Sequence, residues 1–385
     1  MLLGLGASGL AACSPAALAS RPVLAGARFQ RPALAPLVTD PGRISRITVC
    51  TRPFRAAGPR IETEVVGDKR VVHNYGHGGA GWSLSWGSAV LARDLALEGS
   101  VRSVAVIGCG ALGLTTALQI QRAGARTTIY AAERTPGTRS ARATGVWSPA
   151  SRIAATDAID DGFRDRWKLM ARRAWVEHHA FLGLDGDPVS FIDQYNLRAH
   201  EDRRRTVGPV PSPGHVQFEH FRGALDGLGP SGRNLTSDEH PFDVERARVY
   251  PQMTFNVAEY ARQLTEAFLM EGGRIVQRVF NHPSELSGLA QPVVVNCTGY
   301  GARALFGDSS LVPVRGQIGW LVPQPEVTYG INYNAVTMVP RADGIVIQAN
   351  GPDEMVGYGI DDETPDRAET EAALAELATL FAAGR

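Results

Sequence analysis

Hydrophobic and polar positions change their period several times along the chain, which predicts a mixed α/β protein. Residues 61–66 alternate apolar and polar side chains, as does a strand with one buried face. Residues 104–107 and 293–295 are continuous apolar runs, typical of strands that are buried on both faces. After Asn256, apolar residues recur at helical spacing up to Gly272, which predicts an amphipathic helix. We therefore expect parallel strands covered by helices.

One segment joins a buried strand, a glycine-rich turn and a helix. The strand at 104–107 runs directly into Gly108-Cys109-Gly110-Ala111-Leu112-Gly113, a helix follows to Arg122, and 127–130 form the next strand. In such a unit the first glycine permits the turn, the second lets backbone approach a phosphate, and the third lets helix pack on strand. The start of the helix, at Ala111 and Leu112, attracts the anion. The segment predicts a dinucleotide site.

An acidic residue follows this segment at the distance expected of a ribose ligand. Glu133 lies 20 residues beyond Gly113, so its carboxylate could bind the ribose hydroxyl groups. A solvated loop carboxylate is an equally good interpretation, and both stay open.

A second glycine-rich segment comes before the first one. Residues 71–87 place glycines at 76, 78, 79 and 81 among His, Asn, Tyr and Trp residues, and a helix is expected from about 88 to 97. Glycine allows positive φ angles and close approach of the backbone to another group. The pattern predicts a backbone that lies against a flat ligand, which the His, Asn, Tyr and Trp side chains frame.

The second half of the chain is less strongly patterned. Residues 333–339 and 344–348 predict two antiparallel strands, and a last helix starts near Thr364. Residues 198–240 are charged and rich in proline and glycine, which predicts a long loop. The histidines of this loop lack metal spacing, so we expect no metal site.

Composition limits the class of protein. The chain has 385 residues, of which 44% are hydrophobic, with 39 Lys and Arg against 39 Asp and Glu. This length allows two domains, and the zero net charge gives no reason to expect a nucleic-acid partner. The four cysteines form no CxxC pair. After the apolar stretch at the N-terminus, no segment reaches about 18 consecutive apolar residues, so no transmembrane span is expected.

The first 42 residues are expected to be a leader and linker. Leu10-Ala11-Ala12-Cys13 resembles a lipoprotein processing box, in which Cys13 would carry a lipid anchor, but the charged region typical of signal peptides is missing. An unstructured alanine-rich leader explains the segment equally well. A cytoplasmic location and export as a periplasmic or membrane-anchored lipoprotein both stay open.

Several motifs together resemble the D-amino-acid oxidase and D-aspartate oxidase family of FAD flavoproteins. The similar stretches are 52–62, 73–87, 104–113, 142–149, 296–299, 313–317 and 333–340. In that family the elements like Arg52-Pro53-Phe54-Arg55 and His73 to Gly87 close the chain, whereas here they precede the dinucleotide motif. The sequence therefore resembles a circular permutant, which is physically tolerable when the old termini lie close together.

The resemblance implies roles for individual residues. Arg52 would bind the substrate α-carboxylate through its guanidinium fork, the hydroxyl of Tyr333 would contact the same carboxylate, and backbone at Gly79 would face the substrate amine. The family often has a second tyrosine where this chain has Thr337, so the pocket is expected to be more open or to differ in polarity. The residues expected to bind FAD are Gly78, Gly81, Trp82, Ser83, Gly108, Gly110, Ala111, Leu112, Gly113, Glu133, Arg142, Ala143, Thr144, Gly145, Thr298 and Gly299.

The resemblance also implies a fold and a reaction. We expect a Rossmann-like FAD-binding domain with a central parallel sheet (43–155 and 241–310) and a substrate domain with a mostly antiparallel sheet (156–240 and 311–385). The reaction would be oxidative deamination of a D-amino acid, with hydride transfer to flavin N5, giving a 2-oxo acid and ammonia, and with dioxygen as acceptor giving peroxide. Two alternatives stay open: a flavin amine oxidoreductase acting on glycine-like or sarcosine-like substrates, and an FAD-binding protein without turnover. The oligomeric state is not predicted.

Overall fold

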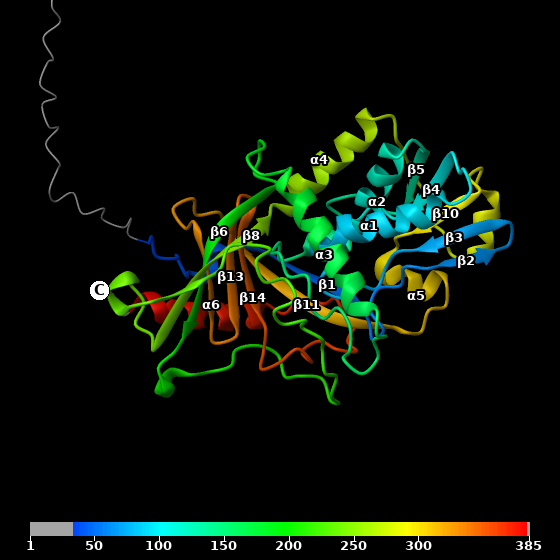
Figure 1. Cartoon of the computed structure of the whole chain (residues 1–385). Coiled ribbons are helices and arrows are strands. Elements are labelled where there is room, and N and C mark those ends of the chain that lie inside the picture. Colours follow the sequence, from blue (N-terminus) through cyan, green and yellow to red (C-terminus); the bar gives the residue numbers. More distant parts are fainter. Residues whose placement is uncertain (1–33, 383–385) are drawn as a thin grey trace, which may run out of the picture. The chain divides into compact units, whose positions relative to one another are not determined.

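The computed structural model describes residues 34–382, which form two β-sheets and the helices packed on them (Figure 1). The predicted α/β fold class, one parallel sheet and one mostly antiparallel sheet, is confirmed. Residues 1–33, including Cys13 and its suggested lipid anchor, lie outside the described part. None of the helices within 34–382 is long and apolar enough to cross a membrane.

The smaller sheet has six strands, and all neighbours run parallel except the β2–β3 pair. Its order is β2 (Thr63–Val66), β3 (Lys69–His73), β10 (Val293–Asn296), β4 (Ser103–Ile107), β5 (Arg126–Ala131) and β9 (Arg274–Gln277). The carboxyl ends of β4 and β10 lead into the glycine turns at Gly108 and Gly299. In open parallel sheets, ligands bind at this edge.

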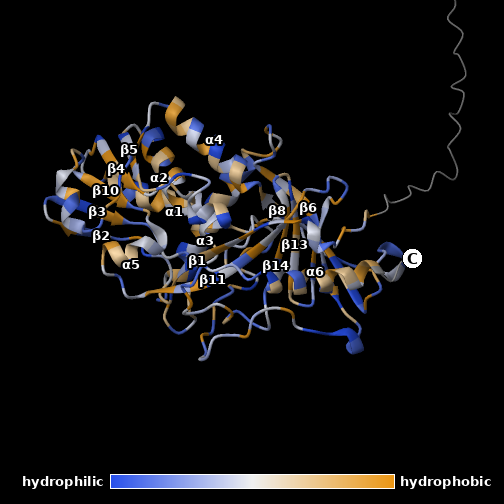
Figure 2. Cartoon of the chain, turned by 180° about the vertical axis from the view of Figure 1, so that it is seen from behind, coloured by the Kyte–Doolittle hydropathy of each residue, from blue (hydrophilic) through white to orange (hydrophobic). Residues whose placement is uncertain are grey.

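Successive side chains of the central strands enter two separate cores. Val72, Val104 and Val106 pack with α1 (Gly81–Leu97), α2 (Ala111–Arg122) and α4 (Val257–Met270). Val71 and Ala105 point to the opposite face, beneath the short helices η5 (Pro283–Gly288) and α5 (Ala302–Leu305). Figure 2 shows the hydrophobic residues concentrated on these strands, and mixed hydrophobic and hydrophilic residues on α4. Burial on both faces explains why these strands are continuous apolar runs.

The larger sheet has eight strands, antiparallel except where β12 pairs with β6. Its order is β1 (Ile44–Arg55), β11 (Leu311–Leu321), β14 (Gly344–Ala349), β13 (Val336–Arg341), β12 (Tyr329–Tyr333), β6 (Val189–Arg198), β8 (Arg246–Phe255) and β7 (Arg233–Leu235). Helix α6 (Arg367–Ala382) covers one face, where Leu374 and Leu377 pack with Ile331 and Ile347. The remaining elements are α3 (Phe163–His179), which packs on α1, and the 3-10 helices η1 (Pro41–Arg43), η2 (Arg139–Arg142), η3 (Glu201–Arg203), η4 (Ser237–Glu239) and η6 (Gly299–Gly301).

Two predicted elements need correction. The predicted antiparallel pair is present as β13 and β14, but its first strand begins at Val336 and not at 333, because the chain reverses at Asn334 and Ala335, whose φ angles are 45° and 64°. These left-handed residues form a two-residue hairpin turn, the geometry that matches strand twist. The helix expected from residue 88 starts instead at Gly81. Small residues hid its first turn, because Gly81, Ser83 and Ser85 are not typical of helix interiors.

Strand membership differs from the predicted domain boundaries at two places. Strands β1 and β8 both belong to the large sheet, although their residues fall in ranges expected for the FAD-binding domain. The two-domain division itself stays a prediction. Within 198–240 the chain is largely irregular, with only η3, β7 and η4 as regular elements.

The start of the described chain lies beside its last helix. Leu37 shares a buried cluster with Leu377 and Leu380, and the hydroxyl of Tyr329 donates to the carbonyl of Ala35 over 2.7 Å. A circular permutant requires such neighbours. The arrangement is compatible with permutation, which stays a prediction.

Candidate active site

A cavity of about 620 Å³ is lined by residues from both sheets. Its walls come from the end of β1, the second glycine-rich segment, the turn after β4, the stretch around η2, the turn after β10 and three more strands of the large sheet, β11, β13 and β14. Representative lining residues from these elements are Thr51, Arg52, Gly78, Gly79, Gly108, Gly110, Ser140, Arg142, Thr298, Gly299, Thr337 and Gln348. Nearly all of the residues expected to bind substrate or cofactor therefore come together; Gly113 and Tyr333 do not line the cavity.

The turn after β4 leaves no room for side chains. A Cβ added to Gly108, whose φ is +105°, would lie 2.5 Å from the carbonyl oxygen of Cys297, and one on Gly110 would lie 2.6 Å from Ser140 Oγ. A Cβ on Gly113 would lie 2.1 Å from the carbonyl oxygen of Gly108, so this glycine lets α2 pack on the turn. The turn thus forms a cradle of bare backbone at the cavity wall.

Two helices begin at the cavity. Helix α2 begins after Gly110 and α1 after Ala80, and neither cap residue supplies a side-chain hydrogen bond. The first N–H groups of a helix carry partial positive charge and attract anions or electron-rich atoms. The geometry therefore suits a pyrophosphate at α2 and a second electron-rich group at α1.

Ser140 is a cavity residue that sequence reasoning missed. Its hydroxyl accepts from the backbone N–H of Ala111 over 3.1 Å, and its carbonyl accepts from Trp82 Nε1 over 2.8 Å. It thus links the starts of both helices. A hydroxyl residue between two arginines close after Glu133 was the available signal.

Arg142 lines the cavity but is already paired. It donates to Glu363 over 2.9 Å and to the carbonyl of Val49 over 3.0 Å, and Arg139 donates to the same carboxylate over 2.8 Å. Glu363 in turn accepts from Thr51 Oγ1. These contacts connect η2 to β1, so Arg142 stabilises the cavity wall in this structure.

The second glycine-rich segment presents only part of itself to the cavity. His77, Gly78, Gly79, Gly81, Trp82 and Ser83 line it, whereas His73, Asn74 and Tyr75 do not. The expectation that all these polar and aromatic side chains frame a ligand is therefore wrong for the first three. Asn74 is buried and donates to Thr116 Oγ1 of α2 over 3.0 Å.

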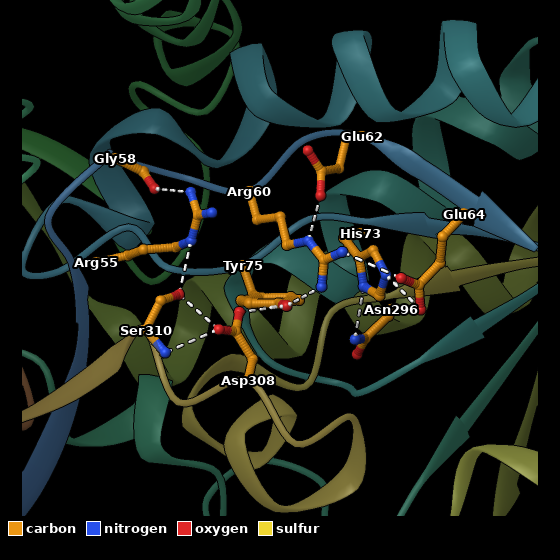
Figure 3. A network of polar contacts seen from close by, with 10 residues as sticks. All are labelled: Arg55, Gly58, Arg60, Glu62, Glu64, His73, Tyr75, Asn296, Asp308 and Ser310. Atoms are coloured by element: carbon orange, nitrogen blue, oxygen red, sulfur yellow. Dashed lines mark hydrogen bonds and ion pairs between the residues drawn. The ribbon is translucent and has the colours of Figure 1, made fainter. Parts of the chain in front are cut away.

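His73 and Tyr75 instead belong to a polar network on the other side of the segment (Figure 3). His73 Nε2 lies 3.1 Å from Glu64 Oε1, and Tyr75 donates to Asp308 over 2.7 Å. Arg60 connects the two by donating to Tyr75 over 2.9 Å and to Glu64 over 3.1 Å. The network joins β2 and β3 to the segment before β11, and this fixes the base of the glycine-rich turn.

His77 is the histidine of the cavity wall, and it is neutral. Its Nε2 lies 2.8 Å from Ser88 Oγ, and that hydroxyl donates to Asn74 Oδ1. Complete burial lowers the pKa of His77 to about 3. It cannot exchange a proton near neutral pH, which agrees with a site that uses no histidine base.

Arg52 extends from β1 over strand β11. Its Nη1 donates to the carbonyl of Arg315 over 3.3 Å, and a Cβ added to Gly316 would lie 2.3 Å from its Nη2. Gly316 thus makes room for the guanidinium. Within residues 34–382, Arg52 makes no ion pair with a carboxylate within 4.0 Å.

Tyr333 lies elsewhere. Its ring is buried beneath α6 with Ile331 and Met338, on the opposite face of β12 from Asn332. Asn332 accepts from Thr337 Oγ1 over 2.8 Å, and Asn350 donates to that same hydroxyl over 2.9 Å. The polar groups that β13, β14 and the residue after β14 bring to the cavity therefore include Thr337, Gln348 and Asn350, and Tyr333 is not among them.

The cavity carries excess positive charge. Five arginines line it (Arg52, Arg139, Arg142, Arg152 and Arg278), and the one carboxylate of its lining within residues 34–382 is Glu133. Glu133 follows β5 directly, beside the turn at Gly108–Gly110. Bare backbone for a pyrophosphate, a carboxylate for ribose hydroxyls and a long adjoining cavity fit FAD.

The chain belongs to the FAD dependent oxidoreductase (DAO) family, whose sequence model matches residues 103–385. It is therefore an FAD-dependent oxidoreductase, and FAD is its cofactor. The match begins at β4 and does not include Arg52 or residues 73–87.

Several proteins similar to this chain are named D-amino-acid oxidase. One from Dugesia ryukyuensis is 24% identical over 251 residues, which cover 63% of this chain and 68% of that protein. One from Streptomyces coelicolor is 28% identical over 218 residues, covering 56% of this chain and 58% of that protein. In this second relative the match spans less than two thirds of its length. A solved glycine oxidase from Geobacillus kaustophilus, 18% identical, shares the fold with a TM-score of 0.51 over 72% of this chain and 78% of that one.

Proposed function

We propose that this protein oxidises D-amino acids, giving the 2-oxo acid, ammonia and hydrogen peroxide. The observation that carries the proposal is Arg52, a cavity guanidinium without a carboxylate partner among the described residues, opposite the backbone of Gly78 and Gly79. An uncompensated guanidinium in a partly buried site favours binding of a planar anion through parallel hydrogen bonds. The α-carboxylate of an amino acid supplies such an anion.

FAD, when bound, accepts the α-hydrogen of the substrate with its two electrons and later reduces dioxygen. The residues of the chain contribute binding and orientation. Arg52 would hold the carboxylate, Thr337 and Asn350 would supply hydrogen bonds nearby, and backbone at Gly79 would face the amine. Apolar side chains of Trp82, Val146 and Ile318 line the same cavity and would exclude water.

The absence of a catalytic base among the lining residues fits this reaction. Of the histidines and carboxylates within 34–382 that line the cavity, His77 stays neutral because burial lowers its pKa to about 3, and Glu133 lies at the phosphate end. Hydride transfer from a bound amino acid needs orientation more than a base at the α-carbon.

A peroxide assay on matched D- and L-amino acids tests the proposal. Purified protein saturated with FAD should form peroxide with D-amino acids and not with their L-enantiomers, and its flavin absorption should bleach under nitrogen. FAD-loaded protein that ignores every D-amino acid would refute the proposal.

A second candidate is oxidation of glycine or sarcosine. It is favoured by one observation: Thr337 lines the cavity at the position where the resemblance implies a second tyrosine, and Tyr333 is buried elsewhere. A pocket without these two phenol rings has room for an N-methyl group. Comparing kcat/KM for D-alanine, glycine and sarcosine separates the two functions.

A further inference from the structure

His73 is a completely buried histidine that does not line the cavity and has no part in the proposed reaction. Its ring packs against the rings of Tyr75 and Phe306, with centroids 5.4 Å and 5.0 Å away. Its Nδ1 lies 3.1 Å from Nδ2 of Asn296, its neighbour on β10, and its Nε2 lies 3.1 Å from Glu64 Oε1 (Figure 3). Both ring nitrogens therefore face specific polar atoms.

Asn296 connects His73 to the wall of the cavity. Its Oδ1 accepts from the backbone N–H of Thr298 over 3.2 Å and from the Thr298 hydroxyl over 2.8 Å, and Thr298 lines the cavity. The Asn296 side chain is completely buried, so water does not replace these partners. Because its oxygen binds Thr298, its amide nitrogen faces His73 and donates to Nδ1. The amide can satisfy all of these partners in one orientation.

This orientation of Asn296 fixes the position of the proton on His73. An amide NH2 group donates and does not accept, so Nδ1 must carry the lone pair and the ring proton must be on Nε2, toward Glu64. A proton on Nδ1 would place two donors 3.1 Å apart. The Asn296 amide would then have to turn, and its NH2 group would meet the N–H of Thr298. The observed contacts of Thr298 therefore require neutral His73.

The groups around His73 keep it neutral at pH 7. The charged or titratable groups that face it from the neighbouring elements are Glu64 of β2, Arg60 and Glu62 of the segment before β2, Tyr75 after β3, and Asp308 before β11, which accepts from Tyr75. Glu64 favours a protonated ring, but Arg60 donates to its second oxygen over 3.1 Å. Burial, and next the charge of Arg60, lower the pKa of His73 from its ordinary value of 6.5, although Glu64 opposes this.

The turn that Asn296 holds adjoins the glycine turn after β4. Cys297 donates its N–H to the carbonyl of Ile107 over 2.8 Å, and its own carbonyl oxygen is the atom that a Cβ on Gly108 would meet at 2.5 Å. Thr298 and Gly299 consequently line the same cavity as Gly108. A movement of this turn would change the surface against which FAD binds.

We infer that His73 is a positioning residue for FAD: its Nδ1 orients Asn296, and Asn296 holds Thr298 in the conformation that binds the cofactor. His73 acts without touching FAD. The inference concerns the cofactor, so it is independent of the substrate named under the proposed function. It gives a role to a polar residue of the second glycine-rich segment that lies away from the cavity. Supporting side chains of this kind fix the geometry of the groups that contact a ligand.

A double-mutant cycle on FAD affinity tests this inference. His73→Leu removes the acceptor and Asn296→Ala removes the connection to Thr298, and each should raise the Kd for FAD at least tenfold at pH 7.5. The double variant should bind FAD within threefold of Asn296→Ala, because His73 acts through Asn296. Fluorescence titration of the apoproteins gives the Kd values. Effects that multiply in the double variant, or an unchanged Kd in His73→Leu, would overturn the inference.

A conservative variant separates the acceptor from the packing of the ring. His73→Asn offers an oxygen close to the position of Nδ1 and cannot be protonated, so it should restore FAD affinity to within threefold of the wild-type value at pH 7.5. A tenfold loss in this variant would contradict the acceptor role. His200→Asn is the matched control: His200 also lies 3.1 Å from a carboxylate, that of Asp243, but it is absent from the cavity lining. Its Kd should equal that of the wild-type protein.

Acid provides a test that does not depend on the folding of His73→Leu or Asn296→Ala. As the pH falls from 7 to 5, His73 binds a proton, Asn296 must turn, and the Kd of the wild-type protein for FAD should rise. The rise should be steeper than in His73→Asn, by up to about tenfold per pH unit, which is the limit for one proton. His200→Asn should follow the wild-type protein, and circular dichroism at each pH verifies folding. Equal slopes for the wild-type protein and His73→Asn would overturn the inference.

Discussion

Gly78 donates its backbone N–H to the carbonyl of Pro53 over 2.9 Å, which joins the glycine-rich segment to the strand that carries Arg52. On its other side, Gly78 leaves no room for a side chain against the carbonyl of Arg152. Gly78 therefore lies between two backbone segments that each carry an arginine of the cavity lining, Arg52 and Arg152. Gly78 and Gly79 make backbone hydrogen bonds within the chain, to Pro53 and Ser151, and also line the cavity, whereas a Cβ added to Gly81 would meet nothing within 4 Å.

The first prediction concerns this glycine. In Gly78→Ala the new Cβ meets the Arg152 oxygen at 1.9 Å and φ is +53°, so we expect a loss of about 2–4 kcal/mol of unfolding free energy. Gly67→Ala is the control, because its φ is +61° and nothing lies within 4 Å of the added Cβ; it should lose only about 1 kcal/mol. Urea unfolding of both variants measures the difference. Equal losses would mean that the tight contact contributes nothing.

The second prediction concerns Arg52. Removing a charge-assisted carboxylate contact in Arg52→Gln should cost about 2–5 kcal/mol in kcat/KM. Arg55→Gln is a matched control on the same strand: Arg55 donates to Ser310 Oγ and to the carbonyl of Gly58, and it is absent from the cavity lining. The measurement is kcat/KM for peroxide formation from a D-amino acid, compared between the two variants at equal FAD content. A larger effect at Arg55 would exclude the carboxylate role of Arg52.

The third prediction separates two glycines of the 108–113 turn. Gly110→Ala places a methyl group where FAD must approach, but it meets only the movable hydroxyl of Ser140, so FAD affinity should fall at least about tenfold with little loss of stability. In Gly113→Ala the added Cβ meets the backbone oxygen of Gly108 at 2.1 Å, so this variant should lose both FAD affinity and stability. Fluorescence titration with FAD and thermal unfolding of the apoprotein provide the two readouts. Identical behaviour of the two variants would contradict the assigned roles.

The fourth prediction follows from the neighbouring ends of the described chain. Joining residue 382 to residue 34 through a short linker, with a new start in the exposed turn at 98–102, should give a protein that folds and binds FAD. The reason is that Leu37 and Leu380 already share one core. Circular dichroism and FAD content measure the result. An insoluble product from several linker lengths would argue against close ends.

Strongly patterned local elements could be predicted from the sequence. The strand ending at Ile107, the turn at Gly108 and the helix ending at Arg122 are all present, because burial on both faces and three close contacts of the glycines, two with backbone and one with the Ser140 side chain, leave few other residue choices. The family resemblance also predicted that Arg52 and the 108–112 turn belong to one site. They line the same cavity, although Arg52 lies on a strand of the large sheet and the turn follows a strand of the small sheet.

Orientation within an element was harder to predict. Tyr333 was expected at the substrate, yet the two-residue turn at Asn334 and Ala335 places its ring in the core beneath α6. A one-residue change of register moves a strand side chain to the opposite face, and sequence similarity does not fix that register. Ser140 was missed because its role depends on contacts with Ala111 and Trp82, which are remote in sequence.

The last prediction concerns stability in acid. His178 is buried against Phe255 and Tyr260, with Nδ1 2.8 Å from the Tyr260 hydroxyl. Burial lowers the pKa of His178 to about 3, as it does that of His77. Below the ordinary histidine pKa of about 6.5, the unfolded chain binds a proton at each position and the folded protein does not. Stability should therefore fall as pH decreases from about 6.5 toward 3, by up to about 1.4 kcal/mol per pH unit for each histidine.

His178→Phe removes one of the two buried histidines that bind a proton only in the unfolded chain. The variant should lose stability at neutral pH, because Tyr260 loses a hydrogen-bond partner. Between pH 6 and 4 its unfolding free energy should change less with pH than that of the wild-type protein, and the two slopes should differ by at most about 1.4 kcal/mol per pH unit. His215→Phe, at an exposed position, should leave the slope unchanged. Urea unfolding at several pH values in saturating FAD gives the slopes. Parallel curves for the wild-type protein and His178→Phe would show that His178 is not held neutral in the folded protein.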